Sequence, residues 1–472
     1  SKEIIIIRQI TKQKQVKLPN VFRPNYQICI AIYMIHKLFP YLCKNYVSME
    51  YKNRIADKLL RDKLEAMGAV LIEGPKACGK TTTAEQQAKS IIYMDDPVKQ
   101  EQYKQMAQTN IRFLLEGETP RLIDEWQHVP QFWDAIRFEV DHRDDDGQFM
   151  LTGSAVPVDM KEIHHTGTGR YGWLTMRPMS LWESGESTGE VSLSDLFLTP
   201  DRIGALNKQT LPMLAFAVCR GGWPKSLQKK TEKAALSQVT EYYKAITNSD
   251  ISRVDNVKRD EERAKRIMRS YARHQGSQAS ISTILADIST NEAGNISDET
   301  VGAYLTALRK IFVIEDMPAW NPNLRSKTAV RTSDTRYYVD PSLGVAALGL
   351  GPNDLINDLN TFGLFFETMC IRDLRVYADA LDGSVYHYRD KNGLECDAVV
   401  HLRNGAYGLI EIKLGGEKLI EDGAKTLTAL TNIIDTSRMK APSFCMVLTG
   451  VGDFAYRRTD GIYVVPVGCL KD

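Results

Sequence analysis

The residues from Gly74 to Thr81 have types and a spacing that suit phosphate binding. They fit the pattern G-x-x-x-x-G-K-S/T at every specified position. Glycines let backbone N–H groups curl around phosphate oxygens, while Lys80 reaches the β- and γ-phosphates and Thr81 supplies an oxygen to Mg²⁺. We therefore predict ATP and Mg²⁺ as cofactors. The residues expected to contact the nucleotide are Gly74, Pro75, Lys76, Ala77, Cys78, Gly79, Lys80, Thr81 and Thr82.

Two acidic residues, Asp124 and Glu125, follow the apolar pair Leu122 and Ile123. A buried strand that ends in this way delivers Asp124 to the magnesium ion, and Glu125 is then placed to orient and deprotonate an attacking water. Two acids at a strand end are, by themselves, often only solvated side chains. After a complete phosphate loop they predict hydrolysis of ATP to ADP. A nucleotide kinase, which transfers the phosphate to another acceptor, is the weaker interpretation.

Two further residues are candidates for contact with the γ-phosphate. Ser154 follows the apolar segment 148–153 and is predicted to be a polar sensor, although an ordinary turn residue is the alternative. Arg170 ends the sequence Gly-Thr-Gly-Arg and is the predicted arginine that meets the γ-phosphate, in cis or from a neighbouring subunit. A structural ion pair is an equally good interpretation of Arg170. Arg220 is a second, weaker candidate for the same role.

The C-terminal region carries a second set of reactive groups. Glu411 and Lys413 are two residues apart in an apolar segment, so their side chains share one face of a strand. Asp397 on the preceding segment and Glu367 on a predicted helix complete the set. Two carboxylates can hold Mg²⁺, which polarises a phosphate, and a lysine helps to activate water. We predict Asp397, Glu411 and Glu367 as metal ligands, with Glu411 and Lys413 catalytic, and a degenerate site kept for binding is the alternative.

The elements that position the first set of residues follow from hydrophobic patterning. Short apolar segments at 69–73, 90–94, 121–125 and 148–153 have the composition of buried parallel strands. Helical patterns alternate with them, one at 132–140, and a further amphipathic helix is predicted at 50–67. Strands that alternate with helices predict an α/β sheet with helices on both faces.

Two further regions have different patterns. Residues 280–289 and 297–311 predict short helices, and 312–316 predicts an edge strand, a spacing that resembles a winged helix. In the tail, Asn-Gly pairs at 392–393 and 404–405 favour tight hairpin turns. They join three predicted antiparallel strands. The expected αβββαβ unit comprises 359–377, 385–389, 394–400, 406–413, 417–434 and two strands at 443–448 and 462–467.

Composition is ordinary for a globular protein, with 43% hydrophobic and 25% charged residues among 472. The net charge of +1 is unevenly spread, because residues 1–48 hold eight Lys or Arg and one Glu, a net charge of +7. The other 424 residues carry 52 basic and 58 acidic groups, a net charge of −6. Any DNA contact of the main body must therefore come from a local basic patch.

The eight cysteines form no C-x-x-C pair, which argues against zinc and suits a reducing cytoplasm. The apolar segment 28–35 is too short to span a bilayer, so we expect no membrane association. A more regular pattern begins at Met49. We expect the native chain to start there and residues 1–48 to be a basic extension that is not native, with a basic, partly disordered arm as the alternative.

These motifs resemble the bacterial and archaeal AAA+-like P-loop ATPases that carry a restriction-endonuclease-like domain of unknown function at the C-terminus. The resemblance implies an AAA+-like core and a D…E-x-K nuclease fold formed by Asp397, Glu411 and Lys413. Ser154 replaces the Asn common in AAA+ sensors, and no second sensor arginine is evident, which argues against a standard hexameric motor. The stretches that carry the resemblance are Val70–Asp96, Arg121–Ala155, Gly167–Glu183, Gly221–Pro224, Tyr338–Leu343 and Gly363–Lys413.

The expected organisation is an extension at 1–48, a P-loop ATPase core at 49–205, a helical lid at 206–275, a winged helix at 276–335 and a nuclease-like domain at 336–472. The first functional hypothesis is a cytoplasmic ATPase that couples ATP turnover to binding or processing of double-stranded DNA, without a membrane partner and with the capacity to form a homo-oligomer. The second is an ATP-dependent switch or scaffold whose inactive tail mediates protein contacts. The body charge of −6 favours the second, and the intact set in the tail favours the first.

Overall fold

The computed structural model describes residues 51–143, 145–153, 166–198, 203–291, 296–321, 333–437 and 439–472. The predicted N-terminal extension and Ser154 lie outside these residues. Within the described ranges, no helix has the length and apolar character needed to cross a membrane.

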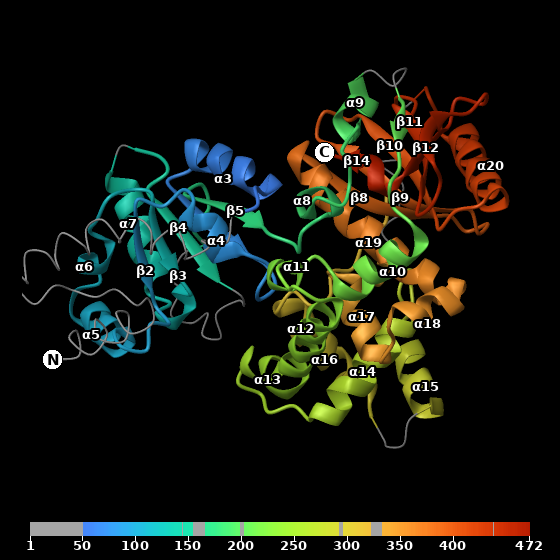
Figure 1. Ribbon diagram of the computed structural model, residues 1–472. Coiled ribbons are helices and arrows are strands. Elements are labelled where there is room, and N and C mark those ends of the chain that lie inside the picture. Colours follow the sequence, from blue (N-terminus) through green and yellow to red (C-terminus); the bar gives the residue numbers. More distant parts are fainter. Residues whose placement is uncertain are drawn as a thin grey trace, which may run out of the picture. The chain divides into compact units, whose positions relative to one another are not determined.

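Five parallel strands form the first sheet, in the order β2-β3-β4-β1-β5 (Figure 1). Their registers align Ala69 with both Phe149 and Tyr171, so the carboxyl ends of the strands also share one edge. The four predicted strands are confirmed, whereas the last strand was not predicted. The strands are β1 (Ala69–Glu73), β2 (Ser90–Tyr93), β3 (Arg121–Asp124), β4 (Phe149–Gly153) and β5 (Tyr171–Thr175).

Helices cover both faces of this sheet, as the alternating pattern predicts. In β1, Val70 and Ile72 pack into one hydrophobic core, while Ala69 and Leu71 pack into another. Successive side chains of a strand point to opposite faces, so each face has its own helices. The first core includes α3 (Ile55–Ala66) and α4 (Lys80–Glu85), and the second includes α5 (Gln100–Asn110), α6 (Arg112–Leu115) and α7 (Phe132–His142).

The segment after β5 packs with the C-terminal part of the chain. β6 (Val191–Ser192) pairs with β14 (Leu470–Lys471), and β7 (Ala205–Leu206) pairs with β12 (Phe454–Arg457). Side chains of α8 (Leu181–Ser184) and α9 (Leu193–Leu198) are buried in the same core as the C-terminal strands. The chain therefore joins the core of the C-terminal strands near residue 181, before the predicted end of the ATPase core at residue 205.

The described residues between 211 and 310 are mainly helical, as predicted. Among its helices, α14, α15 and α16 pack on one another. Two antiparallel bridges follow them, Ile314 with Tyr338 and Met317 with Thr335, so the predicted edge strand is reduced to isolated bridges. The three-helix unit also begins before the predicted boundary at 276. The helices are α10 (Leu211–Arg220), α11 (Pro224–Leu227), α12 (Glu232–Ala245), the π-helix η3 (Ile246–Asp250), α13 (Ile251–Arg253), α14 (Glu261–Arg273), α15 (Ile281–Asn291) and α16 (Asp298–Lys310).

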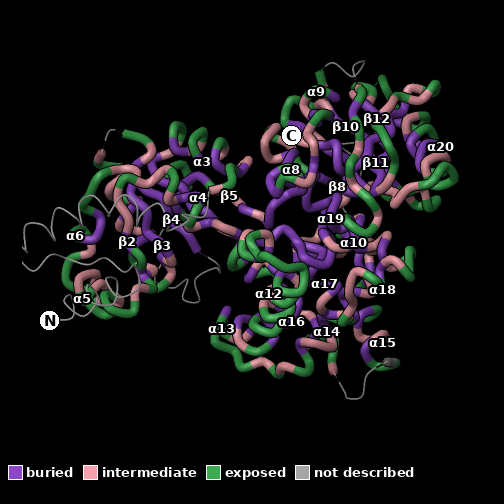
Figure 2. The backbone as a smooth tube through the Cα atoms, in the orientation of Figure 1, coloured by how far each residue is buried: buried purple, intermediate pink, exposed green. Residues whose placement is uncertain are grey.

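The second sheet has the order β7-β12-β13-β11-β10-β9-β8. The predicted hairpins are confirmed, since β9 pairs antiparallel with both β8 and β10, and Gly393 and Gly405 have positive φ at the turns. Buried backbone, purple in Figure 2, runs through α19 and the strands beside it. The further elements are α17 (Pro341–Leu348), α18 (Pro352–Asn357), α19 (Leu359–Ala380), β8 (Gly383–Arg389), β9 (Glu395–Leu402), β10 (Tyr407–Lys413), α20 (Glu417–Ile433), β11 (Phe444–Thr449) and β13 (Tyr463–Pro466).

Candidate functional site

The loop after β1 has backbone conformations that depend on its glycines. Gly74, Ala77 and Gly79 have φ values of 145°, 61° and 107°. A Cβ on Gly74 would lie 2.1 Å from the carbonyl oxygen of Met176, so only glycine lets the loop pass the end of β5. Lys80 follows as the first residue of α4, and its side chain folds back across the loop. Its Nζ donates hydrogen bonds of 2.9 Å to the carbonyl oxygens of Gly74 and Pro75.

Side chains from three neighbouring segments meet at the carboxyl edge of the first sheet. Asp124 Oδ1 accepts a hydrogen bond of 2.7 Å from Thr81 Oγ1 and a second, short one from Thr152 Oγ1. Burial raises the pKa of Asp124, and the nearby Glu125 and Asp95 raise it further, while the two threonine hydrogen bonds lower it. The meeting of Thr81 with Asp124 is the arrangement that the sequence predicts. Thr152 was missed, although it lies in the same polar run as the predicted Ser154.

Glu125 begins the turn at the end of β3. It has φ 53° and ψ 46°, a left-handed conformation that costs a residue with a Cβ on the order of 1 kcal/mol. Strained backbone of this kind is common at functional sites. Gln127, on the short helix Trp126–His128, donates a short hydrogen bond to Glu125 Oε2. Gln127 could not be predicted, because a lone Gln two residues beyond an acidic residue carries no distinctive pattern.

Arg170 does not join these groups within the same chain. It precedes β5 and its carbonyl oxygen accepts from the N–H of Ala69, at the amino ends of the strands. The phosphate loop lies at the carboxyl ends, so the predicted contact in cis is excluded by the direction of the parallel strands. Its Nε instead contacts Asp141 Oδ1 at 2.7 Å, the structural ion pair that was the alternative. Arg220 is buried and paired with Glu186 at 2.7 Å, which removes it as a phosphate contact in this conformation.

The phosphate loop is also tied to segments outside the first sheet. Lys76 Nζ contacts Asp250 Oδ1 of η3 at 2.6 Å. Arg54 donates from Nη1 to the carbonyl oxygen of Cys78 at 2.9 Å and from Nε to Glu183 Oε1 at 2.9 Å. Arg54 and Glu183 are almost fully buried, with side-chain exposures of 4% and 2%. Charged contacts therefore hold the loop against α8 and the helical region.

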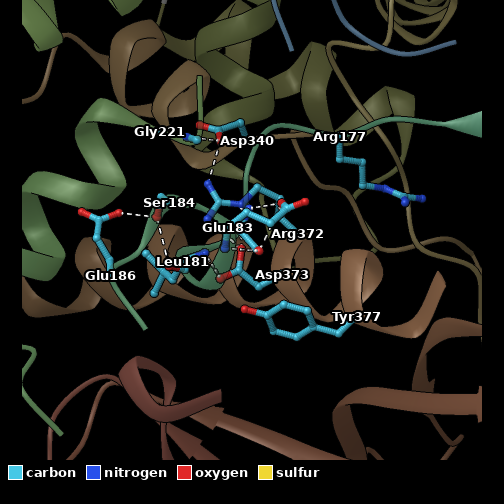
Figure 3. A network of polar contacts seen from close by, with 12 residues as sticks. Arg177, Leu181, Glu183, Ser184, Glu186, Gly221, Asp340, Arg372, Asp373 and Tyr377 are labelled. Atoms are coloured by element: carbon cyan, nitrogen blue, oxygen red, sulfur yellow. Dashed lines mark hydrogen bonds and ion pairs between the residues drawn. The ribbon is translucent and has the colours of Figure 1, made fainter. Parts of the chain in front are cut away.

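A network of buried charges lies next to α8 (Figure 3). Arg372 on α19 contacts Asp340 at 2.8 Å and Asp373 at 2.7 Å. Asp373 also accepts a hydrogen bond of 3.0 Å from the N–H of Leu181. Asp340 accepts a further hydrogen bond of 2.9 Å from the N–H of Gly222. The Gly-Gly-Trp-Pro segment and the segment around Asp340 are thus joined, which gives both of these motifs a structural role.

The predicted C-terminal groups come together on adjacent elements. Lys413 Nζ lies 2.9 Å from Asp397 Oδ2 and 2.7 Å from Glu411 Oε2. Glu367 on α19 accepts a short hydrogen bond from the hydroxyl of Tyr337. Burial and the charge of Asp397 raise the pKa of Glu367 to about 8, and the same two causes raise the pKa of Glu411. The four predicted side chains therefore form one electrostatically coupled cluster. Tyr337 also belongs to this cluster and was not predicted.

The position of Lys413 bears on the predicted metal site in this cluster. In the described part of the chain, no group of three or more His, Cys, Asp or Glu side chains is placed to hold a metal ion. The Lys413 ammonium lies between Asp397 and Glu411, where a cation bound by these two carboxylates would lie. In this conformation Lys413 pairs with two members of the predicted ligand set, and the assignment of Asp397, Glu411 and Glu367 as metal ligands stays a prediction.

We expect Glu367→Gln to stabilise the protein more at alkaline than at acidic pH. The raised pKa means that the folded protein keeps a proton which the unfolded chain releases above about 4.5. Glu367 therefore makes the wild type lose stability as pH rises from 4.5 towards 8, and the glutamine variant lacks this contribution. Urea unfolding at pH 5 and pH 8 measures this difference, with Glu395→Gln, an exposed glutamate, as the control. If the free energies of unfolding of Glu367→Gln and wild type differ by the same amount at pH 5 and pH 8, the raised pKa of Glu367 is contradicted.

Comparisons with known proteins cover three segments of the chain. Residues 67–184 match a family model described as an AAA domain. Residues 212–354 and 362–470 match models of two domains of unknown function, DUF8612 and DUF4143. The search of curated proteins found no match.

Comparison with solved structures gives two proteins that are weakly similar to this chain. One is a Walker-type ATPase of Pyrococcus abyssi, with 14% identity and a TM-score of 0.39, covering 64% of this chain and 99% of that one. The other is the Orc1 protein of Aeropyrum pernix in complex with DNA, with 14% identity and a TM-score of 0.24, covering 66% of this chain and 94% of that one. The AAA model spans the phosphate loop, Asp124 and Glu125. This chain therefore contains an AAA-type P-loop ATPase-like domain, at residues 67–184.

Proposed function

We propose that this protein is a Mg²⁺-dependent ATPase whose nucleotide state is coupled to DNA binding or processing. The observation that carries the ATPase part is the contact of Thr81 with Asp124 beside the Lys80 loop, with Glu125 next in sequence. Oxygen ligands of this kind suit Mg²⁺, which prefers carboxylates, hydroxyls and phosphate oxygens. The donor set therefore fits the metal that the reaction needs.

Each residue of the site has a distinct task in this proposal. Thr81 and Asp124 hold Mg²⁺, which neutralises charge on the β- and γ-phosphates when it is bound. Lys80 exchanges its two backbone carbonyl partners for phosphate oxygens. Glu125, oriented by Gln127, accepts the proton of the attacking water. Ser154 remains the proposed γ-phosphate sensor, and Arg170 can act only from a neighbouring subunit.

The DNA part of the proposal rests on two other regions. The three helices α14 to α16 and the bridges after them support the winged-helix interpretation. The meeting of Glu367, Asp397, Glu411 and Lys413 supports the restriction-endonuclease-like interpretation of the tail. A three-helix unit and a carboxylate–lysine cluster in one chain suit a nucleic-acid partner.

We expect DNA to stimulate ATP hydrolysis by the full chain. The measurement is the ATPase rate with no nucleic acid, with single-stranded DNA and with double-stranded DNA. Stimulation should weaken steeply between 50 and 200 mM salt, a range over which phosphate contacts lose about 10³-fold or more in affinity. A rate that no nucleic acid changes would overturn the coupling to DNA and leave the ATPase assignment standing.

We expect Lys413→Ala to abolish any Mg²⁺-dependent DNA cleavage while ATP turnover is retained. The reason is that Lys413 contacts both Asp397 and Glu411, far in sequence from the phosphate loop. Plasmid nicking and phosphate release, measured on the same preparation, separate the two activities. Lys391→Ala, an exposed lysine in the β8–β9 turn, is the control, and undiminished nicking by Lys413→Ala would exclude this lysine from the mechanism.

Ion pairing near the helical unit favours the second function, an ATP-dependent switch or scaffold with an inactive tail. Arg273 pairs with Asp287, and both Arg309 and Arg336 pair with Asp316. These arginines are therefore partly neutralised rather than free for DNA phosphates. The paired arginines and the carboxylate cluster that contains Lys413 would then serve protein contacts. This is the function that the experiments with DNA would favour if they show no effect of DNA.

A further inference from the structure

A cavity of about 230 Å³ opens beside the phosphate loop. It is lined by Ala77 of the loop, by Trp223 and Lys225 at the start of α11, and by Gln238, Glu241 and Tyr242 on α12. Ala77 therefore belongs both to the loop and to the cavity wall. A volume below the roughly 300–1,000 Å³ of pockets for whole small molecules suits a single ring system.

Two aromatic rings form the inner wall of this cavity. The ring centroids of Trp223 and Tyr242 are 4.6 Å apart, with an angle of 66° between the planes. Trp223 is buried and its Nε1 donates to Ser342 Oγ at 2.9 Å, so the indole has a fixed orientation. Tyr242 is half-buried, and burial raises the pKa of its hydroxyl, so the ring is neutral at physiological pH. Aromatic side chains held in this way are suited to stack on a planar base.

Polar groups complete the wall on α12 and at the mouth. The amide of Gln238 offers both a donor and an acceptor, which matches the edge of a purine base. Lys225 and Glu241 are exposed, and Glu241 is paired with Lys244 at 2.8 Å. The cavity thus combines an apolar aromatic interior with one neutral polar group, whereas a site for a second phosphate would need cations inside it.

We propose that this cavity receives the base of the nucleotide whose phosphates lie in the Gly74–Thr81 loop. The proposal rests on the proposed ATPase function, because it takes the phosphate position as given. It assigns Tyr242 as a stacking residue and Gln238 as the residue that contacts the base edge. Trp223, in the Gly-Gly-Trp-Pro segment, then links the base to the buried Asp340 network through Ser342.

The test compares ATP with inorganic tripolyphosphate, which has the phosphates and lacks the base. Titration calorimetry with Mg²⁺ gives the Kd of each ligand for the full chain. Tyr242→Ala should weaken ATP binding about tenfold, the lower part of the range found for loss of a base-stacking residue, and leave tripolyphosphate binding unchanged. Tyr242→Phe should bind ATP like the wild type, since it keeps the ring. Tyr456→Ala, on the distant strand β12, is the matched control.

The possible results are distinguishable. Equal weakening of both ligands by Tyr242→Ala, or no weakening of either, would overturn the base site while the phosphate site stands. Wild-type affinity for tripolyphosphate equal to that for ATP would also overturn the base site alone. Loss of both ligands in Lys80→Ala supports the phosphate position, and a wild type that binds neither ligand would overturn the ATPase proposal and the base site together.

Discussion

Glu125→Gln is expected to lower the rate of ATP hydrolysis by about 100- to 10,000-fold, the usual contribution of a general base. Glutamine keeps the shape and the hydrogen bond to Gln127 but cannot accept the proton of the attacking water. Binding of ATP should survive, because Lys80, Thr81 and Asp124 are unchanged. Phosphate release under saturating ATP measures the rate, and titration calorimetry measures the binding.

Glu116→Gln is the matched control, since Glu116 is exposed and follows α6 away from the site. It should leave both the rate and the affinity unchanged. A Glu125→Gln variant that hydrolyses ATP within threefold of the wild type would show that another group activates water. A variant that loses ATP binding as well would indicate that Glu125 supports the loop and not the chemical step.

Arg372→Met is expected to lower the free energy of unfolding by about 3–5 kcal/mol, the usual cost of removing one partner from a buried ion pair. The side-chain exposures of Arg372, Asp340 and Asp373 are 2%, 0% and 1%, so water cannot replace the lost cation. Burial already raises the pKa of Asp373 to about 6, although Arg372 lowers it. Without the arginine both carboxylates would remain buried and unpaired with any cation. Urea unfolding at pH 7 measures the change.

Lys58→Ala provides the contrast, because Lys58 and Asp62 are exposed and 3.6 Å apart on α3. Exposed pairs contribute at most about 1 kcal/mol, so this variant should unfold close to the wild type. Adding Asp340→Asn and Asp373→Asn to Arg372→Met should recover part of the lost stability, since the uncompensated charges are then removed. If Arg372→Met alone lowers the free energy of unfolding by less than about 1 kcal/mol, the proposed contribution of this network to stability is contradicted.

Some parts of the site could be predicted because they are local in sequence. The phosphate loop needs glycines, a lysine and a hydroxyl at fixed offsets, and one segment supplies all of them. The hairpins between β8, β9 and β10 were predictable for the same reason, since each Asn-Gly pair sets its own turn. Asp124 was predictable from its place at the end of an apolar segment.

Other features depend on partners that are distant in sequence. Arg170 looked suitable for the γ-phosphate because β5, the strand that follows it, was not predicted, so its place at the amino ends of the strands was not known from the sequence. Gly221 and Gly222 looked like a motif without a role until Asp340 was found against them. A Cβ on Gly221 would lie 2.3 Å from Asp340 Oδ1, a contact that no local pattern predicts.

The sequence by itself determined the chemistry of this protein: a loop that can hold phosphates, an acidic pair beside it and a carboxylate–lysine set in the tail. These follow from residue type and short-range spacing. The tertiary structure decided which of them meet. It joined Thr152 and Gln127 to the acidic pair, placed Lys413 between two proposed metal ligands and packed α8 and α9 into the core of the C-terminal strands. Strand order and buried ion pairs bring together residues that are far apart in the chain. Both depend on tertiary packing and not on the local sequence.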